Sequence, residues 1–181
     1  HSFKRKSIDV LFFTGVAGSA KSELSQWDIV IPTELVQHDM DARPLFNKYV
    51  IPALNKDRIK SNRNWFKWAS SVLQESINKN LINEFKKVHQ GLIATGDVFV
   101  DDKDFLDNLS LELKGLSAVE MEGAAVAQVA TQENIPFVVI RVISDNANDE
   151  SGIDFNKFLE DYKIESWKLI NSILLEINDQ N

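Results

Sequence analysis

The sequence predicts an α/β domain built around a mostly parallel or mixed sheet. Segments with the pattern of buried strands alternate along the chain with segments of helical periodicity, and neither an internal repeat nor a low-complexity linker interrupts this alternation. A length of 181 residues with 44% hydrophobic residues suits one domain over residues 1–181 and is short for two.

The strands are predicted from short apolar runs that end in turn residues. Residues 8–13 (IDVLFF) form a continuous run that ends near Gly15, which is typical of a strand buried on both faces. Pro32 is expected to separate two short strands. After these, the run FVVIRVIS is the clearest buried strand in the chain. In order, the further strands are predicted at residues 27–31, 34–38, 87–94, 117–120 and 137–144.

Helices are predicted where apolar residues recur every three or four positions, at residues 64–80, 101–113, 122–132 and 154–177. The third helix is rich in glycine and alanine, which permits close approach to a neighbouring element. The first helix begins in a basic, tryptophan-containing segment. We interpret that segment as a solvated helix face over a Trp-lined core and not as a polyanion site.

Composition excludes several classes of protein. Acidic residues outnumber basic ones, 27 to 20, for a formal charge of −7, so no general nucleic-acid partner is expected. The absence of cysteine removes disulfides, thiolate metal sites and cysteine nucleophiles. No apolar run approaches the roughly 20 residues that span a bilayer, so no membrane partner is expected. The opening HSFKRKS runs directly into a predicted strand and does not resemble a signal peptide.

Chemistry is expected where the strands end, because ligands of such sheets bind beyond the carboxyl ends of the strands. Small or acidic residues follow the buried runs in the segments TGVAG, GDVFV, VEME and ISDN. Gly15 and Gly18 would let backbone N–H groups approach a ligand, although for an isolated GxxG a tight strand-to-helix turn is the favoured interpretation. No GxGxxG or GxxxxGK[ST] motif offers a phosphate cradle.

Two acidic positions admit both a functional and a structural interpretation. Alternation would send Glu120 and Glu122 broadly one way and Met121 the other, so the carboxylates could clamp vicinal hydroxyls. Alternatively, Glu122 stabilises a helix N-terminus electrostatically. Asp145 follows the most hydrophobic strand and could protonate a leaving group, or it could be a turn residue. His38 and Asp39 lack a second histidine nearby, so no metal site is expected there.

The motifs FTGVAGS, HDMDA, GLIATGDVFV, AVEMEGAAVAQVA and PFVVIRVISD, in this order, resemble the 5′-methylthioadenosine/S-adenosylhomocysteine nucleosidases of the purine nucleoside phosphorylase-like superfamily. The resemblance covers nearly the whole chain from Ile8. It implies a three-layer α/β sandwich with a twisted mixed central sheet. It also implies a homodimer that releases adenine from methylthioadenosine or S-adenosylhomocysteine in nucleoside catabolism and methionine salvage. No cofactor is expected.

The resemblance also implies roles for individual residues. Asp145 would protonate N7 of the departing adenine, and Ser144 would orient it. Phe99 would stack on the purine, and the backbone of Val100 would bind its Watson–Crick edge. Glu122 would hold the ribose hydroxyls, with Met121 and Gly18 beside the sugar. The segment from His38 to Phe46 would reach the site of the partner subunit.

Water is the expected nucleophile. Purine nucleoside phosphorylases that resemble this chain carry an arginine just before the GxxG turn, where Phe13 stands here, and a phenyl ring cannot bind phosphate. Val16 stands where several family members have serine, which predicts one polar contact fewer near the ribose. The alternatives are futalosine hydrolase, purine nucleoside phosphorylase and a non-catalytic protein that binds purine nucleosides.

The family pattern also begins earlier than this sequence does. It opens with a strand that ends in a G-A-M-x-x-E motif, whose glutamate activates the attacking water, and no such motif precedes IDVLFFTG. We expect a truncated chain. The alternatives are a segment supplied by a second polypeptide and a degenerate, non-catalytic paralogue. A cytoplasmic location is expected only by default, since a missing start would hide any signal peptide.

Overall fold

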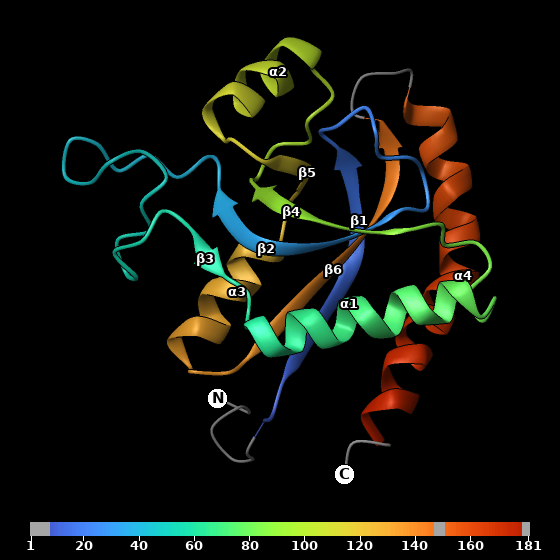
Figure 1. Cartoon of the computed structure of the whole chain (residues 1–181). Coiled ribbons are helices and arrows are strands. Elements are labelled where there is room, and N and C mark those ends of the chain that lie inside the picture. Colours follow the sequence, from blue (N-terminus) through green and yellow to red (C-terminus); the bar gives the residue numbers. More distant parts are fainter. Residues whose placement is uncertain (1–7, 147–150, 179–181) are drawn as a thin grey trace.

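The computed structural model describes the backbone of residues 8–146 and 151–178, and the side chains of residues 8–144 and 155–177. Strands and helices alternate along most of the described chain (Figure 1). The strands are β1 (Leu11–Ser19), β2 (Ile29–Gln37), β3 (Ile59–Lys60), β4 (Val88–Thr95), β5 (Leu116–Glu120) and β6 (Phe137–Asn146). The helices are α1 (Arg63–Asn78), α2 (Lys103–Glu112), α3 (Gly123–Gln132) and α4 (Ser151–Asn178).

The strands form a mixed sheet in the order β3-β2-β4-β5-β1-β6, which confirms the predicted sheet type. The β1–β6, β2–β4 and β4–β5 pairs are parallel, and the β1–β5 and β2–β3 pairs are antiparallel. One further pairing was not predicted: β2 also pairs antiparallel with β6, Ile29 opposite Val142. The sheet therefore curls into a closed, barrel-like ring, with β3 added at the outside of β2.

Helices cover both faces of this sheet, as the predicted three layers require. Helices α1 and α4 share one core with alternate residues of β6, among them Val138, Ile140 and Val142. Helix α3 packs on the other face with Val139 and Ile143, and it contacts β1, β2, β3, β4 and β6. The small residues of α3, Ala124, Ala127 and Ala130, are all buried, which confirms the close approach that the sequence predicts. Helix α2 covers the ends of β4 and β5.

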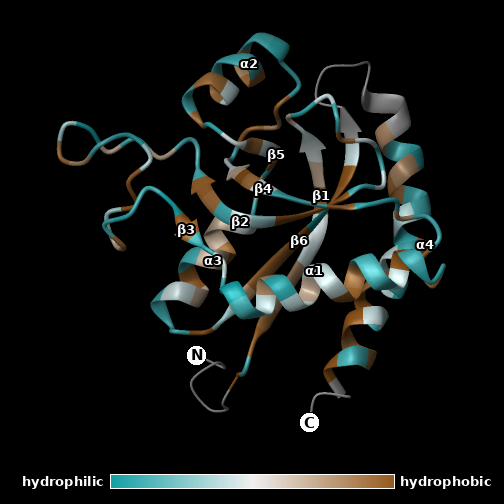
Figure 2. Ribbon diagram, in the orientation of Figure 1, coloured by the Kyte–Doolittle hydropathy of each residue, from teal (hydrophilic) through white to brown (hydrophobic). Residues whose placement is uncertain are grey.

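Hydrophobic residues concentrate along the strands, whereas the helices alternate between hydrophobic and hydrophilic positions (Figure 2). This is the pattern expected when a sheet is buried on both faces and each helix buries a single stripe. In the described part of the chain, no helix combines the length and the apolar character needed to cross a membrane.

The prediction that Pro32 separates two strands is wrong, because β2 runs through it. The pairing of β2 with β4 shifts between Pro32 and Glu34, so a bulge accommodates the missing N–H donor. On the other side, Ser61 donates from its hydroxyl to the Pro32 carbonyl (2.6 Å) and from its N–H to the Thr33 carbonyl (3.1 Å). The two residues of β3, just before Ser61, were too few for the sequence pattern to indicate a strand.

The GxxG segment does not form a strand-to-helix turn. Strand β1 continues through Gly15 and Gly18 to Ser19, because it pairs with β6 along its length and with β5 at its end. The pairing with β6 shifts between Ala17 and Gly18, where β6 has one extra residue, Ser144, so the bulge lies in β6 opposite this segment. Gly15 therefore lies in the middle of β1, opposite Arg141, and Gly18 lies near the end of the strand.

Candidate active site

A cavity of about 230 Å³ lies at the end of the sheet where β1, β5 and β6 stop. It contains every sequence-predicted site residue whose side chain is described: Gly18, Phe99, Val100, Met121, Glu122 and Ser144. These residues come from the ends of three strands and from the segment after β4. Parallel pairing brings the ends of β1 and β6 together, and likewise those of β4 and β5. The antiparallel contact of Gly18 and Ser19 with Val119 and Ala118 then joins the two pairs, so positions distant in sequence converge here.

Gly18 occupies the centre of this edge. It pairs with Val119 of β5 on one side and with Asp145 of β6 on the other. The backbone of Asp145 therefore lies directly beside the glycine that lines the cavity. The side chain of Asp145 is outside the described residues, so its predicted role rests on this backbone position.

Ser144, which precedes Asp145, is buried and lines the same cavity. Its hydroxyl donates to the Ala17 carbonyl at 3.3 Å, and its own carbonyl accepts a hydrogen bond from the Gln26 side-chain amide at 2.7 Å. These contacts fix the end of β6 against β1 and against the segment between β1 and β2.

Two aromatic side chains lie opposite the strand ends. Phe99, which is 52% exposed, lines the cavity, and Val100 next to it is buried in the core beneath α2. Phe155 of α4 approaches Phe99 edge to face, with 6.3 Å between ring centroids. Phe155 was not predicted as a site residue, because in the sequence it is one of the apolar residues that recur along the last helix.

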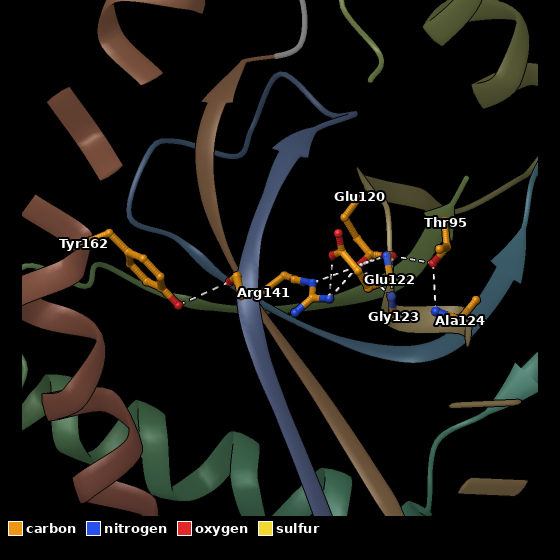
Figure 3. A network of polar contacts seen from close by, with 8 residues as sticks. Thr95, Glu120, Glu122, Gly123, Ala124, Arg141 and Tyr162 are labelled. Carbon is orange, nitrogen blue, oxygen red and sulfur yellow. Dashed lines mark hydrogen bonds and ion pairs between the residues drawn. The ribbon is translucent and has the colours of Figure 1, made fainter. Parts of the chain in front are cut away.

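Glu120 lines the cavity. It is the centre of a buried polar network (Figure 3). The Glu120 carboxylate accepts hydrogen bonds from Arg141 Nε at 3.0 Å and Nη2 at 2.6 Å. It also accepts from the N–H groups of Glu122 (3.1 Å) and Gly123 (2.7 Å), and from the Thr95 hydroxyl. The Thr95 hydroxyl in turn accepts from the Ala124 N–H at 2.8 Å. We call Thr95, Glu120 and Arg141 the buried network.

The charges of the buried network neutralise each other. The Arg141 and Glu120 side chains are 1% and 2% exposed, and a buried pair of this kind is stable only when its remaining hydrogen-bonding groups are satisfied. The carboxylate also meets the positive end of α3. The electrostatic stabilisation of this helix N-terminus, which the sequence analysis considered for Glu122, is thus provided by Glu120. Glu122 makes no side-chain capping bond.

The guanidinium of Arg141 packs against two residues of β1, Phe13 and Gly15. Its guanidinium carbon lies 4.4 Å from the centre of the Phe13 ring. Nη1 has no hydrogen-bond partner and packs against Gly15, where an added Cβ would lie 2.5 Å from it. The Gly15 carbonyl accepts a hydrogen bond from the Tyr162 hydroxyl at 3.4 Å (Figure 3). Burial raises the pKa of Tyr162, and the positive charge of Arg141 opposes that rise.

Phe99, Met121 and Glu122 form what we call the exposed rim. The Glu122 side chain is 63% exposed, and its carboxylate lies 3.6 Å from Arg141 Nη2. Met121, 40% exposed, lines the cavity as well, so the predicted opposite orientation of the methionine is wrong. Strand β5 ends at Glu120, so strand alternation no longer applies to the next residue. The exposed rim can therefore contact a ligand in the cavity, whereas the Glu120 carboxylate of the buried network is already engaged.

The segment from His38 to Phe46 follows β2. His38 is buried within its own chain, whereas Leu45 is 85% exposed. Lys48 and Tyr49, just beyond the segment, both bond to Glu112 at the end of α2, the lysine at 2.6 Å. The described residues contain no group of three or more His, Asp or Glu side chains suited to hold a metal.

The sequence matches the Phosphorylase superfamily over residues 1–174. It is 36% identical to the 5′-methylthioadenosine/S-adenosylhomocysteine nucleosidase of Anoxybacillus flavithermus, over 97% of this chain and 72% of that protein. It is 35% identical to the nucleosidase of the same name from Bacillus subtilis, over 96% of this chain and 72% of that one.

Solved structures show the same similarity. The nucleosidase of Neisseria meningitidis, in complex with methylthio-immucillin-A, superposes with a TM-score of 0.79 and 31% identity over 92% of this chain and 69% of that one. The futalosine hydrolase of Helicobacter pylori superposes with a TM-score of 0.77 and 34% identity over 93% and 68%. This chain belongs to the 5′-methylthioadenosine/S-adenosylhomocysteine nucleosidase family of the phosphorylase superfamily.

Proposed function

We propose that this protein hydrolyses the N-glycosidic bond of 5′-methylthioadenosine and S-adenosylhomocysteine, releasing adenine and a 5-thioribose product. The observation that carries the proposal is the convergence of Gly18, Phe99, Val100, Met121, Glu122 and Ser144 on one cavity. Family membership supplies the substrate class, and the cavity combines an apolar wall with an acidic edge, as a purine riboside requires.

In the proposed reaction, the bond between C1′ of the ribose and N9 of adenine breaks as Asp145 donates a proton to N7. Protonation matters because neutral adenine leaves readily, whereas its anion does not. The electron-deficient sugar that remains takes a hydroxyl from water. The proton that this water loses returns to Asp145 through solvent or a base. Glu122 accepts hydrogen bonds from the ribose hydroxyls, contacts that strengthen as positive charge develops on the sugar.

The purine would lie in the cavity, against its apolar wall. Phe99 stacks on the ring and the backbone of Val100 binds its Watson–Crick edge, while Met121 and Gly18 contact the sugar. Ser144 orients Asp145. The fixed positions of Val100 in the core and of Ser144 against β1 support this arrangement, because both anchor the neighbouring ligand-binding residue.

Hydrolysis is favoured over phosphorolysis by the surroundings of Phe13. Its ring covers the guanidinium of Arg141, and two nitrogens of that guanidinium are bonded to Glu120. This cation is therefore committed to a carboxylate, which disfavours binding of a phosphate dianion beside it.

We also propose that the protein works as a single domain, as a homodimer and in the cytoplasm. The exposed Leu45, in the segment from His38 to Phe46, supports the dimer, because an apolar side chain at that position can close the thioalkyl end of the partner's site. The oligomeric state is testable by sedimentation of the chain and of a Leu45→Glu variant, which should dissociate.

The deciding experiment measures adenine release from methylthioadenosine by this chain and by the longest product of its gene, with and without phosphate. Release that is independent of phosphate and lost in Asp145→Asn supports the proposal. Glu84→Gln, an exposed carboxylate away from the cavity, is the matched control and should retain full activity. Phosphate-dependent release, or an Asp145→Asn variant with full activity, would contradict it.

Futalosine hydrolysis is the second candidate, favoured by the similarity to the Helicobacter pylori enzyme. The same assay run with futalosine separates the two substrates. Adenine binding without turnover of either substrate would instead indicate a purine-nucleoside-binding protein.

A further inference from the structure

The segment after β4 that carries Phe99 and Val100 is held at its base by the end of β2. The His38 N–H donates to the Thr95 carbonyl at 2.8 Å, extending the β2–β4 pairing by one residue. The Gly96 N–H donates to the Glu120 carbonyl at 3.1 Å. The base of the segment is therefore fixed to two neighbouring strands.

Beyond this base, His38 and Asp39 make two side-chain contacts with the segment. The imidazole of His38 packs against Gly96 so closely that a Cβ there would lie 2.2 Å from Nε2 and 2.5 Å from Cε1. The Asp39 carboxylate accepts a hydrogen bond from the Asp97 N–H at 2.8 Å. The two residues that follow β2 thus contact Gly96 and Asp97, which precede the proposed purine-binding residues.

The imidazole is itself held from behind. Phe105 of α2 meets it at 65° with ring centroids 5.9 Å apart, and His38 is 6% exposed. Its Nε2 is buried without a hydrogen-bond partner, so a hydrogen bond from this atom does not explain the position of the ring. The ring instead fills the space between α2 and the Gly96 backbone, while Val98 and Phe99 further on are exposed.

We propose that His38 and Asp39 are positioning residues for the purine-binding segment: His38 by packing on Gly96, and Asp39 by bonding the Asp97 N–H. This inference rests on the proposed function and adds two residues that do not line the cavity. The two contacts set where Phe99 and the Val100 backbone stand relative to the strand ends. Their loss weakens purine binding before it affects bond cleavage.

Burial holds the pKa of His38 below its usual value, which agrees with a neutral ring at this position. The negative charges of Asp39 and Glu120 oppose this shift, and the positive charge of Lys48 adds to it.

The experiment compares His38→Ala, Asp39→Ala and Asp39→Asn by calorimetry with adenine, by steady-state kinetics and by amide hydrogen exchange. The alanine variants should raise the adenine Kd about tenfold, since each loses one hydrogen bond or packing contact. KM should rise more than kcat falls. Amides of Val98, Phe99 and Val100 should exchange faster, while those of β6 stay protected. Asp39→Asn retains an acceptor oxygen and should restore binding.

A double-mutant cycle tests the packing contact separately. Gly96→Ala places a methyl group against the imidazole and should weaken binding, whereas adding His38→Ala opens the space and should restore part of it. His89→Gln, which replaces a partly buried histidine near the start of β4, is the control and should change neither binding nor exchange at residues 98–100.

Unchanged Kd and unchanged exchange at residues 98–100 in both alanine variants would overturn the proposal, as would a harmless Gly96→Ala. If His38→Ala does not fold, the exposed Asp39 carries the same comparison. If the unsubstituted protein neither binds adenine nor releases it, the proposed function fails. In that case, amide exchange at residues 98–100 can be measured in the single variants and in the double-mutant cycle. Those exchange rates still decide whether His38 and Asp39 hold the segment.

Discussion

Glu120 and Glu122 are the same amino acid two positions apart, yet they occupy opposite environments in one cavity. Glu120 belongs to the buried network and has its carboxylate fully engaged, whereas Glu122 belongs to the exposed rim, where its carboxylate lies 3.6 Å from Arg141 Nη2. The difference shows that two carboxylates at one strand end, two residues apart, can be buried in a polar network and exposed at the cavity. Four substitutions can break or sharpen this contrast.

Removing the buried carboxylate should have the largest effect. Glu120→Ala leaves the Arg141 charge unpaired in the interior and uncaps α3, which should lower the free energy of unfolding by about 3–5 kcal/mol. Urea denaturation followed by circular dichroism measures this loss. Glu122→Ala is the matched control and should change stability by less than about 0.5 kcal/mol. Equal effects at the two positions would remove the distinction between network and rim.

Neutralising the rim carboxylate should affect catalysis and spare stability. Glu122→Gln keeps the shape of the side chain but weakens its hold on the ribose hydroxyls, so kcat/KM should fall on the order of 10²-fold. Adenine release under subsaturating substrate measures the change. A variant that kept full kcat/KM would show that the rim carboxylate does not bind the sugar.

Crowding the network from β1 should have an intermediate effect. In Gly15→Ala the added carbon would lie 2.5 Å from Arg141 Nη1, so the guanidinium must shift, at an expected cost of about 1–3 kcal/mol. Gly115→Ala is a useful comparison, because nothing lies within 4 Å of the added carbon there but φ is +86°. Thermal denaturation of both variants separates crowding from backbone strain.

The smallest effect should come from acidification. Burial lowers the pKa of His38 below 6.5, so the unfolded chain binds a proton first as the pH falls. The stability associated with the neutral ring is complete above pH 6.5 and is lost as the pH falls through the folded-state pKa. Asp39 and Glu120 limit this loss, and Lys48 increases it. His38→Gln should show a shallower decline in unfolding free energy over this range. An identical pH profile in the variant would contradict the assignment.

Much of the site could be predicted because the ends of buried strands can be recognised from the sequence. Each buried apolar run stops at small or acidic residues, and ligands of such sheets bind beyond the carboxyl ends of the strands. The antiparallel contact between β1 and β5, which completes the site, was not part of that prediction. The resemblance to the nucleosidases then supplied expected roles for residues such as Phe99 and Glu122. The carboxyl end of β6 could be placed through its backbone, although the side chain of Asp145 lies outside the described residues.

The buried network escaped prediction, although one signal for it was present. Arg141 interrupts the most hydrophobic strand of the chain, and a charged residue in such a run is rarely buried without a partner. That signal could have directed attention to Glu120 before Glu122. Phe155 could not be found this way, because nothing in a helical apolar stripe distinguishes the residue that reaches a cavity from those that pack on the sheet.

The closed ring of strands also has a consequence for how the chain folds. Ile29 and Val142 are paired across the closure, although more than a hundred residues separate them in sequence. Bringing such distant segments together costs loop entropy before any contact compensates for it, so closure is expected to come late and slowly. On the ribosome, β2 must wait for β6 to emerge, and until then its edge is open to other partners.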